Sequence, residues 1–273
     1  MDGPVSVVGF LCRTSDRTAG GARGVQALAP LLAEQAGVEP RFIGSPGEPR
    51  DQSWSDDLRE SRGCLLEAGG QVDDALVAGR FPVLLAGDCS IATTTLPTVA
   101  RHAPEAYVLW LDAHGDFNTP DTTPSGFLGG MCLAAACGRW DAGLADDAVD
   151  PAQVIMCGAR DIDGGERVLL ESAGVRNVRP SQLADMVDGE QVYVHLDLDV
   201  LDPSVLPSQF PAEGGLSDGG LRTLLGEVAG VSTLLGVEIT AFEAPENEVE
   251  RGGLAETIAS IVAPLVTEAV RGV

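Results

Sequence analysis

The sequence predicts an α/β fold built on a mostly parallel sheet, and two observations lead to that class. Short apolar runs alternate along the chain with longer amphipathic or Ala/Leu-rich stretches. This alternation is typical of strand–helix units that form a parallel sheet covered by helices. The runs are also continuously apolar rather than alternately apolar and polar, which indicates strands that are buried on both faces.

Eight apolar runs are short enough to be buried strands, and a stretch of helical composition follows each of them. In chain order, the predicted strands are Val5–Cys12, Arg41–Ile43, Pro82–Ala86, Ala106–Leu111, Gln153–Cys157, Arg176–Val178, Gln191–Leu198 and Thr233–Ala241. In the same order, the predicted helices are Ala22–Ala36, Asp56–Ala78, Ile91–Arg101, Leu128–Cys137, Gly165–Ala173, Ser181–Val187, Asp218–Ala229 and Leu254–Val270.

The chain has 273 residues, of which 44% are hydrophobic and 21% are charged. This is an ordinary globular composition, and the length suits one large α/β domain or two small ones. The sequence shows neither an internal repeat nor a low-complexity linker. We therefore expect a single domain over residues 1–273.

The net charge is −24, from 17 basic and 41 acidic residues, and every basic residue is an arginine. Because the chain has no basic stripe, we expect neither a nucleic-acid partner nor binding to an anionic membrane. The absence of lysine excludes Schiff-base chemistry, lysine-anchored pyridoxal phosphate and a Walker A phosphate loop.

The six cysteines include no C-x-x-C pair, and most lie inside apolar runs. We expect five of the six to be small buried hydrophobes in a reducing cytosol. The N-terminus lacks a basic region followed by an apolar core, and no apolar run approaches the roughly 18 residues that span a membrane. The sequence therefore predicts a soluble, cytoplasmic protein.

Acidic residues cluster where two predicted strands end. Asp112–Asp116 (DAHGD) follows one strand, and Asp197–Pro203 (DLDVLDP) closes another. Carboxylates at low dielectric are strongly disfavoured unless cations neutralise them. A polar turn would also explain Asp199–Pro203 taken alone, but two such clusters in one parallel sheet favour a site for two divalent metals.

Alternate side chains of an extended segment point the same way, so Asp112, His114 and Asp116 are predicted to converge. The same parity places Asp197 and Asp199 on one face. A third segment, Ala86–Ser90 (AGDCS), ends a strand and puts a thiol at the same edge of the sheet. Ligands of open parallel sheets bind beyond this edge.

These three segments, in this order, resemble the motifs of the ureohydrolase family of arginases and agmatinases over nearly the whole chain. The resemblance implies a three-layer α/β/α sandwich around an eight-stranded, mostly parallel sheet, the arginase-like fold. It also implies two Mn²⁺ ions bridged by a hydroxide that attacks a guanidino carbon. By position, it implies that one metal is held by Cys89, Asp112, Asp116 and Asp197, and the other by Asp112, His114, Asp197 and Asp199.

The loop after the first acidic cluster resembles the arginase version of the family. Residues 118–126 (NTPDTTPSG) imply that Asn118, Thr123 and Ser125 receive the α-carboxylate of an amino acid. Residues 158–163 (GARDID) imply that Asp163 receives the α-ammonium group, with Glu166 nearby. Although a polar turn and a surface acid would give the same residues, the pattern predicts a small amino-acid substrate with a guanidino-type tail.

Three positions depart from the family pattern. Cys89 stands where the family has a histidine ligand. A thiolate there adds negative charge and favours metals softer than Mn²⁺. The alternative is that Cys89 is only a packing residue and that the first metal site is weak. Gly129 stands where the family has a proton-shuttling histidine. Ala241 stands where arginases have a glutamate facing the guanidinium, and either Glu243, which has the same strand parity, or Glu238 is a candidate replacement.

These departures argue against a plain arginase. An N-hydroxylated guanidine is less basic and bulkier than a guanidinium, and Gly129 and Ala241 would leave room for its hydroxyl. We therefore predict hydrolysis of Nω-hydroxy-L-arginine to L-ornithine and hydroxyurea, an activity of the antibiotic-biosynthesis branch of the family. The alternatives are arginase, another guanidino-acid hydrolase or a catalytically silent amino-acid-binding relative. For His195 the sequence leaves two roles open, a residue beside the metals and a core histidine. Because members of the family are often trimers or hexamers, a homo-oligomer is also possible.

Overall fold

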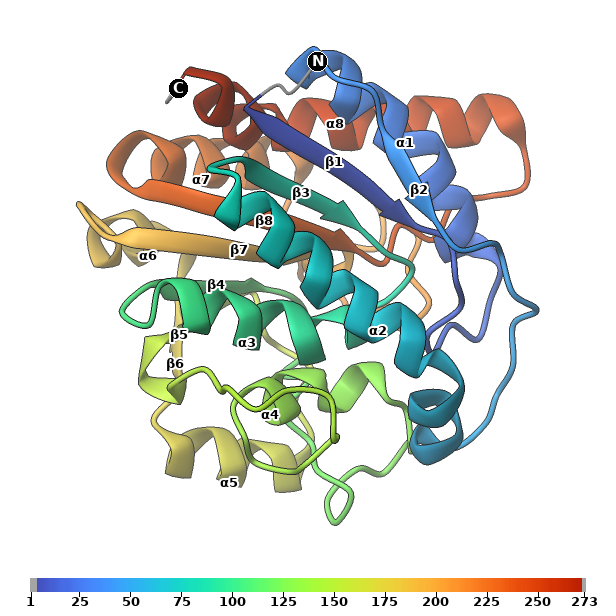
Figure 1. The fold of residues 1–273 in the computed structure, drawn as a ribbon, viewed down its shortest axis with the longest axis vertical. Helices are drawn as coiled ribbons and strands as arrows, with labels where there is room; N and C mark the ends of the chain where they lie inside the picture. The colour runs from blue at the N-terminus through green and yellow to red at the C-terminus, as the bar shows by residue number, and fades with distance from the viewer. Residues whose placement is uncertain (1–3, 272–273) are drawn as a thin grey trace.

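An eight-stranded sheet runs through the middle of the computed structural model, which describes residues 4–271 (Figure 1). The spatial order is β2-β1-β3-β8-β7-β4-β5-β6, and each neighbouring pair is parallel. The strands are β1 Val5–Phe10, β2 Arg41–Ile43, β3 Phe81–Leu85, β4 Tyr107–Leu111, β5 Val154–Cys157, β6 Arg176–Val178, β7 Gln191–Asp197 and β8 Thr233–Thr240. Because all eight strands run the same way, their carboxyl ends lie along one edge of the sheet.

Helices cover both faces of this sheet, so the molecule has three layers (Figure 1). One face carries α1 Gly20–Ala36, α6 Pro180–Met186, α7 Asp218–Val231 and α8 Glu248–Arg271. The other face carries α2 Trp54–Val77, α3 Ala92–His102, α4 Cys132–Ala136 and α5 Gly164–Ala173. In β4, Leu109 packs into the core of the first face and Trp110 into the core of the second. Burial on both faces explains the continuously apolar strands, and the predicted α/β/α sandwich is confirmed.

All eight predicted strands are present, and the main differences concern two helices. The predicted helix Leu128–Cys137 is divided into a 3-10 turn, η2 (Gly129–Met131), and the short α4, because two adjacent glycines disfavour a regular helix. Helix α8 begins at Glu248, six residues before the predicted start. There Asn247 Oδ1 accepts hydrogen bonds from two backbone amides of the first turn, at 3.0 and 3.1 Å, and acts as its N-cap.

The cysteines differ from the prediction. Cys12, in the loop after β1, and Cys64, in α2, are joined by a disulfide, and both are half-buried. The expectation that five of the six are buried hydrophobes is therefore wrong, because within residues 4–271 four cysteines are buried free thiols: Cys89, Cys132, Cys137 and Cys157. The two partners lie 52 residues apart in sequence, so composition and spacing alone gave no signal for the pair.

Helix α8 has the length and mean hydropathy of a membrane span, contrary to the sequence-based expectation for apolar runs. Its most apolar stretch is 44% buried inside the molecule. Ile258, Ile261 and Leu265 belong to the core cluster that also holds residues of α1 and α7. A core helix of a three-layer fold has this composition, so the helix itself gives little support for a membrane segment.

Candidate metal centre

The carboxyl ends of β3, β4, β7 and β8 surround a cavity of about 430 Å³. All six predicted metal ligands line it: Cys89, Asp112, His114, Asp116, Asp197 and Asp199. His114 is half-buried and the other five side chains are buried. The structure therefore gathers four carboxyl groups, an imidazole and a thiol in one space that is largely removed from water.

On one side of the cavity, the imidazole of His114 lies between two carboxylates. Its Nδ1 is 3.0 Å from Asp199 Oδ2 and 3.4 Å from Asp112 Oδ1. Ligand atoms of these three residues all lie within 4.8 Å of one another. Burial alone would lower the pKa of His114, but hydrogen bonds to Asp112 and Asp199 outweigh burial and raise that pKa to about 12. This part of the cavity therefore strongly favours positive charge.

On the other side, Cys89 faces the second acidic cluster. Its Sγ donates to Asp197 Oδ2 at 2.8 Å and lies 3.1 Å from Thr240 Oγ1. Ligand atoms of Cys89, Asp112 and His195 also lie within 4.8 Å of one another. Burial and the charges of the nearby aspartates raise the pKa of the Cys89 thiol well above its usual range. A bound cation would reverse this effect, because a metal-coordinated thiol is deprotonated.

Asp116 completes this side and has a strained backbone, with φ of +46°. Its carbonyl accepts hydrogen bonds from Leu133 N at 3.0 Å and Ala134 N at 3.2 Å, at the start of α4. Its Oδ2 accepts from Cys132 Sγ at 3.7 Å. Such a conformation in a residue other than glycine costs on the order of 1–3 kcal/mol and is typical of functional sites. The α4 contacts hold the carboxyl group in the cavity.

Cys89 opens a 3-10 turn, η1 (Cys89–Ile91), whose N-cap is Asp88. Asp88 Oδ1 accepts from Ser90 N at 2.8 Å, while its Oδ2 accepts from Thr14 Oγ1 at 2.7 Å and from Ser15 N at 2.8 Å. The loop after β1 therefore fixes the turn that presents the thiol.

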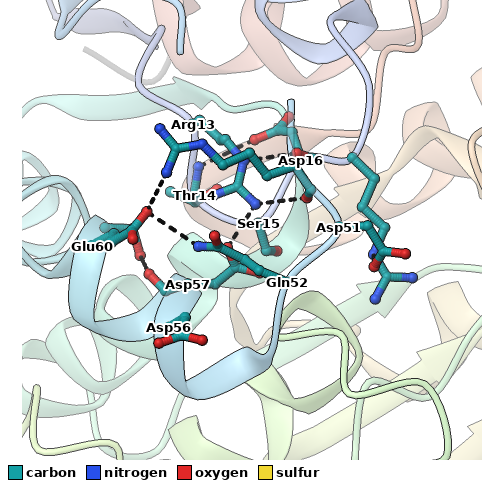
Figure 2. Close-up of polar contacts among 12 residues, drawn as sticks. Arg13, Thr14, Ser15, Asp16, Asp51, Gln52, Asp56, Asp57 and Glu60 are labelled. Carbon is teal, nitrogen blue, oxygen red and sulfur yellow. Dashed lines mark hydrogen bonds and ion pairs between the residues drawn. The ribbon is translucent and has the colours of Figure 1, made fainter. Parts of the chain in front are cut away.

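Figure 2 shows how that loop is itself anchored. Arg13 donates to Asp16 O at 2.9 Å and forms a buried ion pair with Asp57 of α2, at 2.6 Å between Nη2 and Oδ1. Gln52 donates to the same carboxylate oxygen at 2.9 Å. Removing one member of a buried ion pair is strongly destabilising, so this cluster gives the turn before Cys89 a rigid support.

Backbone amides orient the other ligands. Asp197 Oδ1 accepts from Asp199 N at 2.7 Å at the start of η4 (Leu198–Val200), and Asp199 Oδ1 accepts from Ala113 N at 3.0 Å. Arg160 then joins η4 to the next loop, donating to Asp199 O at 2.9 Å and to Ala212 O at 2.8 Å. Sequence reasoning missed this arginine, because backbone carbonyls from distant loops leave no local pattern.

The donor set fits divalent cations. Burial raises the pKa of Asp197 to about 7. Burial also raises the pKa values of Asp116 and Asp199, and the negative charge of neighbouring aspartates raises them further. Among the described residues, Asp112 Oδ2 is buried and has no hydrogen-bond partner. Uncompensated carboxylates at this depth are unfavourable without a counter-charge. Hard carboxylate oxygens with one imidazole and one thiol suit first-row divalent metals.

The predicted head-group residues lie on the rim. Asn118, Ser125 and Asp163 line the cavity, and Asn118 Nδ2 donates to Asp163 Oδ2 at 3.0 Å. Thr123 is not part of the lining within residues 4–271, and its hydroxyl instead accepts from Gly126 N at 3.1 Å, which holds the turn. The structure therefore brings three of the four residues to the cavity.

Glu166 lies at the same rim. Its Oε1 accepts from Phe117 N at 2.7 Å, and its Oε2 accepts from Asp163 N at 3.1 Å, which closes a capping box at the start of α5. Burial raises the pKa of Glu166 to about 7, against the opposing effect of the two backbone hydrogen bonds.

The space that Gly129 leaves is filled by an aromatic ring. A Cβ at Gly129 would lie 2.4 Å from Phe127 Cε1. Phe127 lines the cavity and packs on Phe210, with ring centroids 4.9 Å apart. The guanidinium of Arg17 lies over the Phe127 ring, 5.1 Å from its centroid. No sequence pattern pointed to Phe210, which lies on the loop after η4 and lines the cavity. The predicted free room at Gly129 is therefore occupied by Phe127.

The structure separates the two candidates for the acid missing at Ala241. Glu243 lines the cavity together with Ala241, and both of its carboxylate oxygens lie 2.7 Å from Thr18 Oγ1. Ala241 has a φ of +59°, and this bend follows the end of β8. Glu238 instead lies inside β8, is fully buried and is not a lining residue in the described part of the chain. Of the two, only Glu243 can face a ligand.

A model of the arginase family matches residues 55–268. The chain belongs to the arginase family. It is 36% identical to the N(omega)-hydroxy-L-arginine amidinohydrolase of Streptomyces lavendulae over 257 residues, which cover 92% of this chain and 93% of that one. It is 37% identical to the arginase of Bacillus caldovelox over 168 residues, which cover 54% and 56% of the two chains.

Solved arginase-family structures share the fold. The native structure of the Bacillus caldovelox arginase matches 97% of this chain and 98% of its own, with 26% identity and a TM-score of 0.82. These matches confirm the family and the arginase-like fold predicted from the three motifs. This arginase-family protein is therefore a hydrolase of the amidinohydrolase class, acting on a guanidino or amidine group.

Proposed function

We propose that this protein hydrolyses Nω-hydroxy-L-arginine to L-ornithine and hydroxyurea at a centre for two divalent metals. The observation that carries the proposal is the thiol of Cys89, which lies among the carboxylates where the family pattern has an imidazole. The similarity to a relative named for the same reaction supports it.

The ligand sets follow the two sides of the cavity. Cys89, Asp112, Asp116 and Asp197 would hold one ion, and Asp112, His114, Asp197 and Asp199 would hold the other. When bound, two such ions lower the pKa of a water molecule and stabilise the charge that develops on the guanidino group. Mn²⁺ suits the carboxylates, whereas the thiolate favours a softer divalent metal on its side.

The head group of the substrate would lie on the rim. Asn118 and Ser125 offer neutral donors to an α-carboxylate, and Asp163 offers a carboxylate to an α-ammonium group. Thr123 would act by holding the turn that presents Ser125, since its hydroxyl is bonded to Gly126 N. A head group fixed at this rim would direct a long side chain toward the acidic cluster.

The guanidino end would lie between the ligands and the region of Ala241 and Glu243. Ala241 offers no acid to clamp a full guanidinium charge, and the carboxylate of Glu243, which lines the cavity, already accepts a hydrogen bond from Thr18 Oγ1. An electron-withdrawing hydroxyl makes hydroxyguanidine less basic, so it needs a weaker clamp. Phe127 fills the space at Gly129 and packs on Phe210, so we place the hydroxyl on the Ala241 side of the cavity.

The reaction adds water to the guanidino carbon and breaks the bond to the δ-nitrogen, which leaves as the amine of ornithine with a proton. At Gly129 the chain offers no imidazole for that proton. Arginine and hydroxyarginine release the same ornithine amine and need the same proton, so another group at the cavity must deliver it.

A kinetic comparison tests the proposal. We expect kcat/KM for hydroxyarginine to exceed that for arginine by about tenfold or more, roughly 1.4 kcal/mol. The matched control is Asp163→Asn, which should weaken both substrates about equally because both carry the same head group. Equal or better turnover of arginine by the wild-type enzyme would refute the assignment, and arginase, for which Glu243 would be the clamp, would replace it.

A further inference from the structure

Beneath the metal ligands, three side chains form a second row across the sheet. Trp110 of β4 pairs with His195 of β7, and His195 pairs with Glu238 of β8. All three are fully buried. Two residues nearer the cavity, Asp197 pairs with Thr240, so His195 lies directly below one of the predicted ligands on the same face of the sheet.

Glu238 is surrounded by donors. His195 Nδ1 is 2.6 Å from its Oε1, while Thr95 Oγ1 donates to Oε2 at 2.5 Å and Tyr193 OH donates to Oε2 at 3.3 Å. Because Glu238 accepts in all three contacts, Nδ1 of His195 is the donor in its own. The lone pair of the neutral imidazole is then on Nε2.

That lone pair is unused by the protein. Within residues 4–271, His195 Nε2 is buried and has no hydrogen-bond partner. A ring nitrogen of His195 nevertheless lies within 4.8 Å of both Cys89 Sγ and a carboxylate oxygen of Asp112. The thiol of Cys89 donates to Asp197 instead, so it does not satisfy the imidazole. A buried acceptor with no donor is unfavourable, and here it borders a metal-binding cavity.

We propose that His195 binds the metal on the Cys89 side through Nε2, with Glu238 as the carboxylate that fixes its tautomer. The inference rests on the metal centre of the proposed function and adds a ligand to it. Ligating histidines usually donate their other ring N–H to a carboxylate, the arrangement that Glu238 provides. The ring of Trp110 stacks on His195, with centroids 3.6 Å apart, and keeps the imidazole parallel to the indole.

This ligand would compensate for the departure at Cys89. A thiolate in place of an imidazole adds a negative charge to the site, and the imidazole of His195 restores a neutral nitrogen donor from a different strand. The first metal would thus keep a nitrogen ligand, delivered from below the carboxylates instead of from η1.

Nitrogen NMR of ¹⁵N-histidine-labelled, metal-free protein titrated with Zn²⁺ tests the proposal directly, because the chain has only three histidines. We expect the Nε2 resonance of His195 to report an unprotonated nitrogen before Zn²⁺ is added and to shift when it binds. His114 should also shift, and His102, which pairs with Asp73 on the surface, should not. His195→Gln assigns the resonance; if that variant fails to fold, His114→Gln and the pH titration of exposed His102 assign it by elimination.

Affinity measurements on two variants give a second readout. Glu238→Gln should weaken Zn²⁺ binding at one of two sites by about 10–100-fold, as loss of a carboxylate partner does elsewhere. Tyr193→Phe is the matched control, because it removes a donor to Glu238 but leaves the His195–Glu238 bond intact, and it should bind both ions normally.

The outcomes separate the two proposals. Zn²⁺ binding that shifts His114 but leaves the Nε2 of His195 unchanged or protonated overturns the role of His195 alone. A protein that binds no Zn²⁺ at all overturns the metal centre, and with it the proposed function. A preference for arginine in the kinetic comparison would refute the substrate while leaving the His195 ligand in place.

Discussion

The two sides of the metal centre differ in exposure and in how far they depart from the family pattern. The side of His114 and Asp199 includes the one half-buried ligand, His114, and consists only of carboxylates and an imidazole. The side of Cys89 is buried and pairs a thiol with Asp197 and Thr240, above the row of His195 and Glu238. Of the three departures from the family pattern, the one that changes a predicted metal ligand, Cys89, therefore lies on the buried side.

This difference has a physical reason. A ligand on the buried side is held by its neighbours, so a change there needs compensation from other buried groups. Thr240 and His195 both lie within reach of Cys89 and provide such groups.

The largest expected effect comes from Asp112, which belongs to both sides. We expect Asp112→Asn to lower kcat by roughly 10³-fold, because several kcal/mol of charge stabilisation by the metals are lost. Metal content should fall below two ions per chain. Elemental analysis and steady-state kinetics on the same preparation measure both.

Asp202→Asn is the matched control. Asp202 belongs to the second acidic motif but accepts hydrogen bonds from Ser204 N and Gly214 N, at 3.0 Å each, outside the cavity lining. It should retain wild-type kcat and metal content. If Asp112→Asn kept both ions and its activity, the two sides would not share this carboxylate and the comparison between them would fail.

The sequence predicted the parts of the site that depend on strand ends. Asp112 and Asp197 end buried strands, and parallel strands bring such ends to one edge, so their meeting follows from topology. The same logic fails for Arg160, whose guanidinium joins loops that are far apart in sequence. It also fails for Phe127, because the sequence shows that Gly129 lacks a side chain but not which neighbour fills the space.

His195 shows the same limit more sharply. Its parity with Asp197 placed it on the right face, but parity does not say whether a buried imidazole is satisfied. That depends on Glu238, which comes from another strand 43 residues away. Sequence therefore predicts which residues share a face, whereas tautomers and unpaired atoms depend on cross-strand register.

A smaller effect should appear in the stability of the metal-free protein. Burial raises the pKa of Asp197 from 3.8 to about 7, so between these values the folded chain keeps a proton that the unfolded chain has lost. Stability is then highest at low pH and falls as the pH rises toward 7, by up to about 4 kcal/mol for this group. His114 adds no slope up to about pH 6, since it is protonated in both states there.

Thermal unfolding in chelator from pH 5 to pH 7 measures this slope. The melting temperature should fall with rising pH, and saturating Mn²⁺ should reverse the trend because metals bind the deprotonated ligands. Asp197→Asn should reduce the metal-free slope, and the raised pKa values of Asp116, Asp199 and Glu166 should account for the slope that remains. A metal-free melting temperature that rises over this range would show that the buried side carries its charge without a cation, contrary to the proposed asymmetry.

The smallest effect concerns the ligand that distinguishes the two sides. Cys89→His would restore the family's imidazole, remove one negative charge and strengthen the metal as a Lewis acid. We expect the ratio of kcat/KM for hydroxyarginine to that for arginine to fall by about tenfold, or 1.4 kcal/mol. The Co²⁺-loaded wild type should show a thiolate-to-metal charge-transfer band that the variant lacks.

Cys132→Ser, which changes a neighbouring buried thiol bonded to Asp116, controls for general disturbance and should keep both the band and the ratio. If the band were absent in the wild type, Cys89 would be a packing residue, and the buried side would depend on His195 and the carboxylates alone.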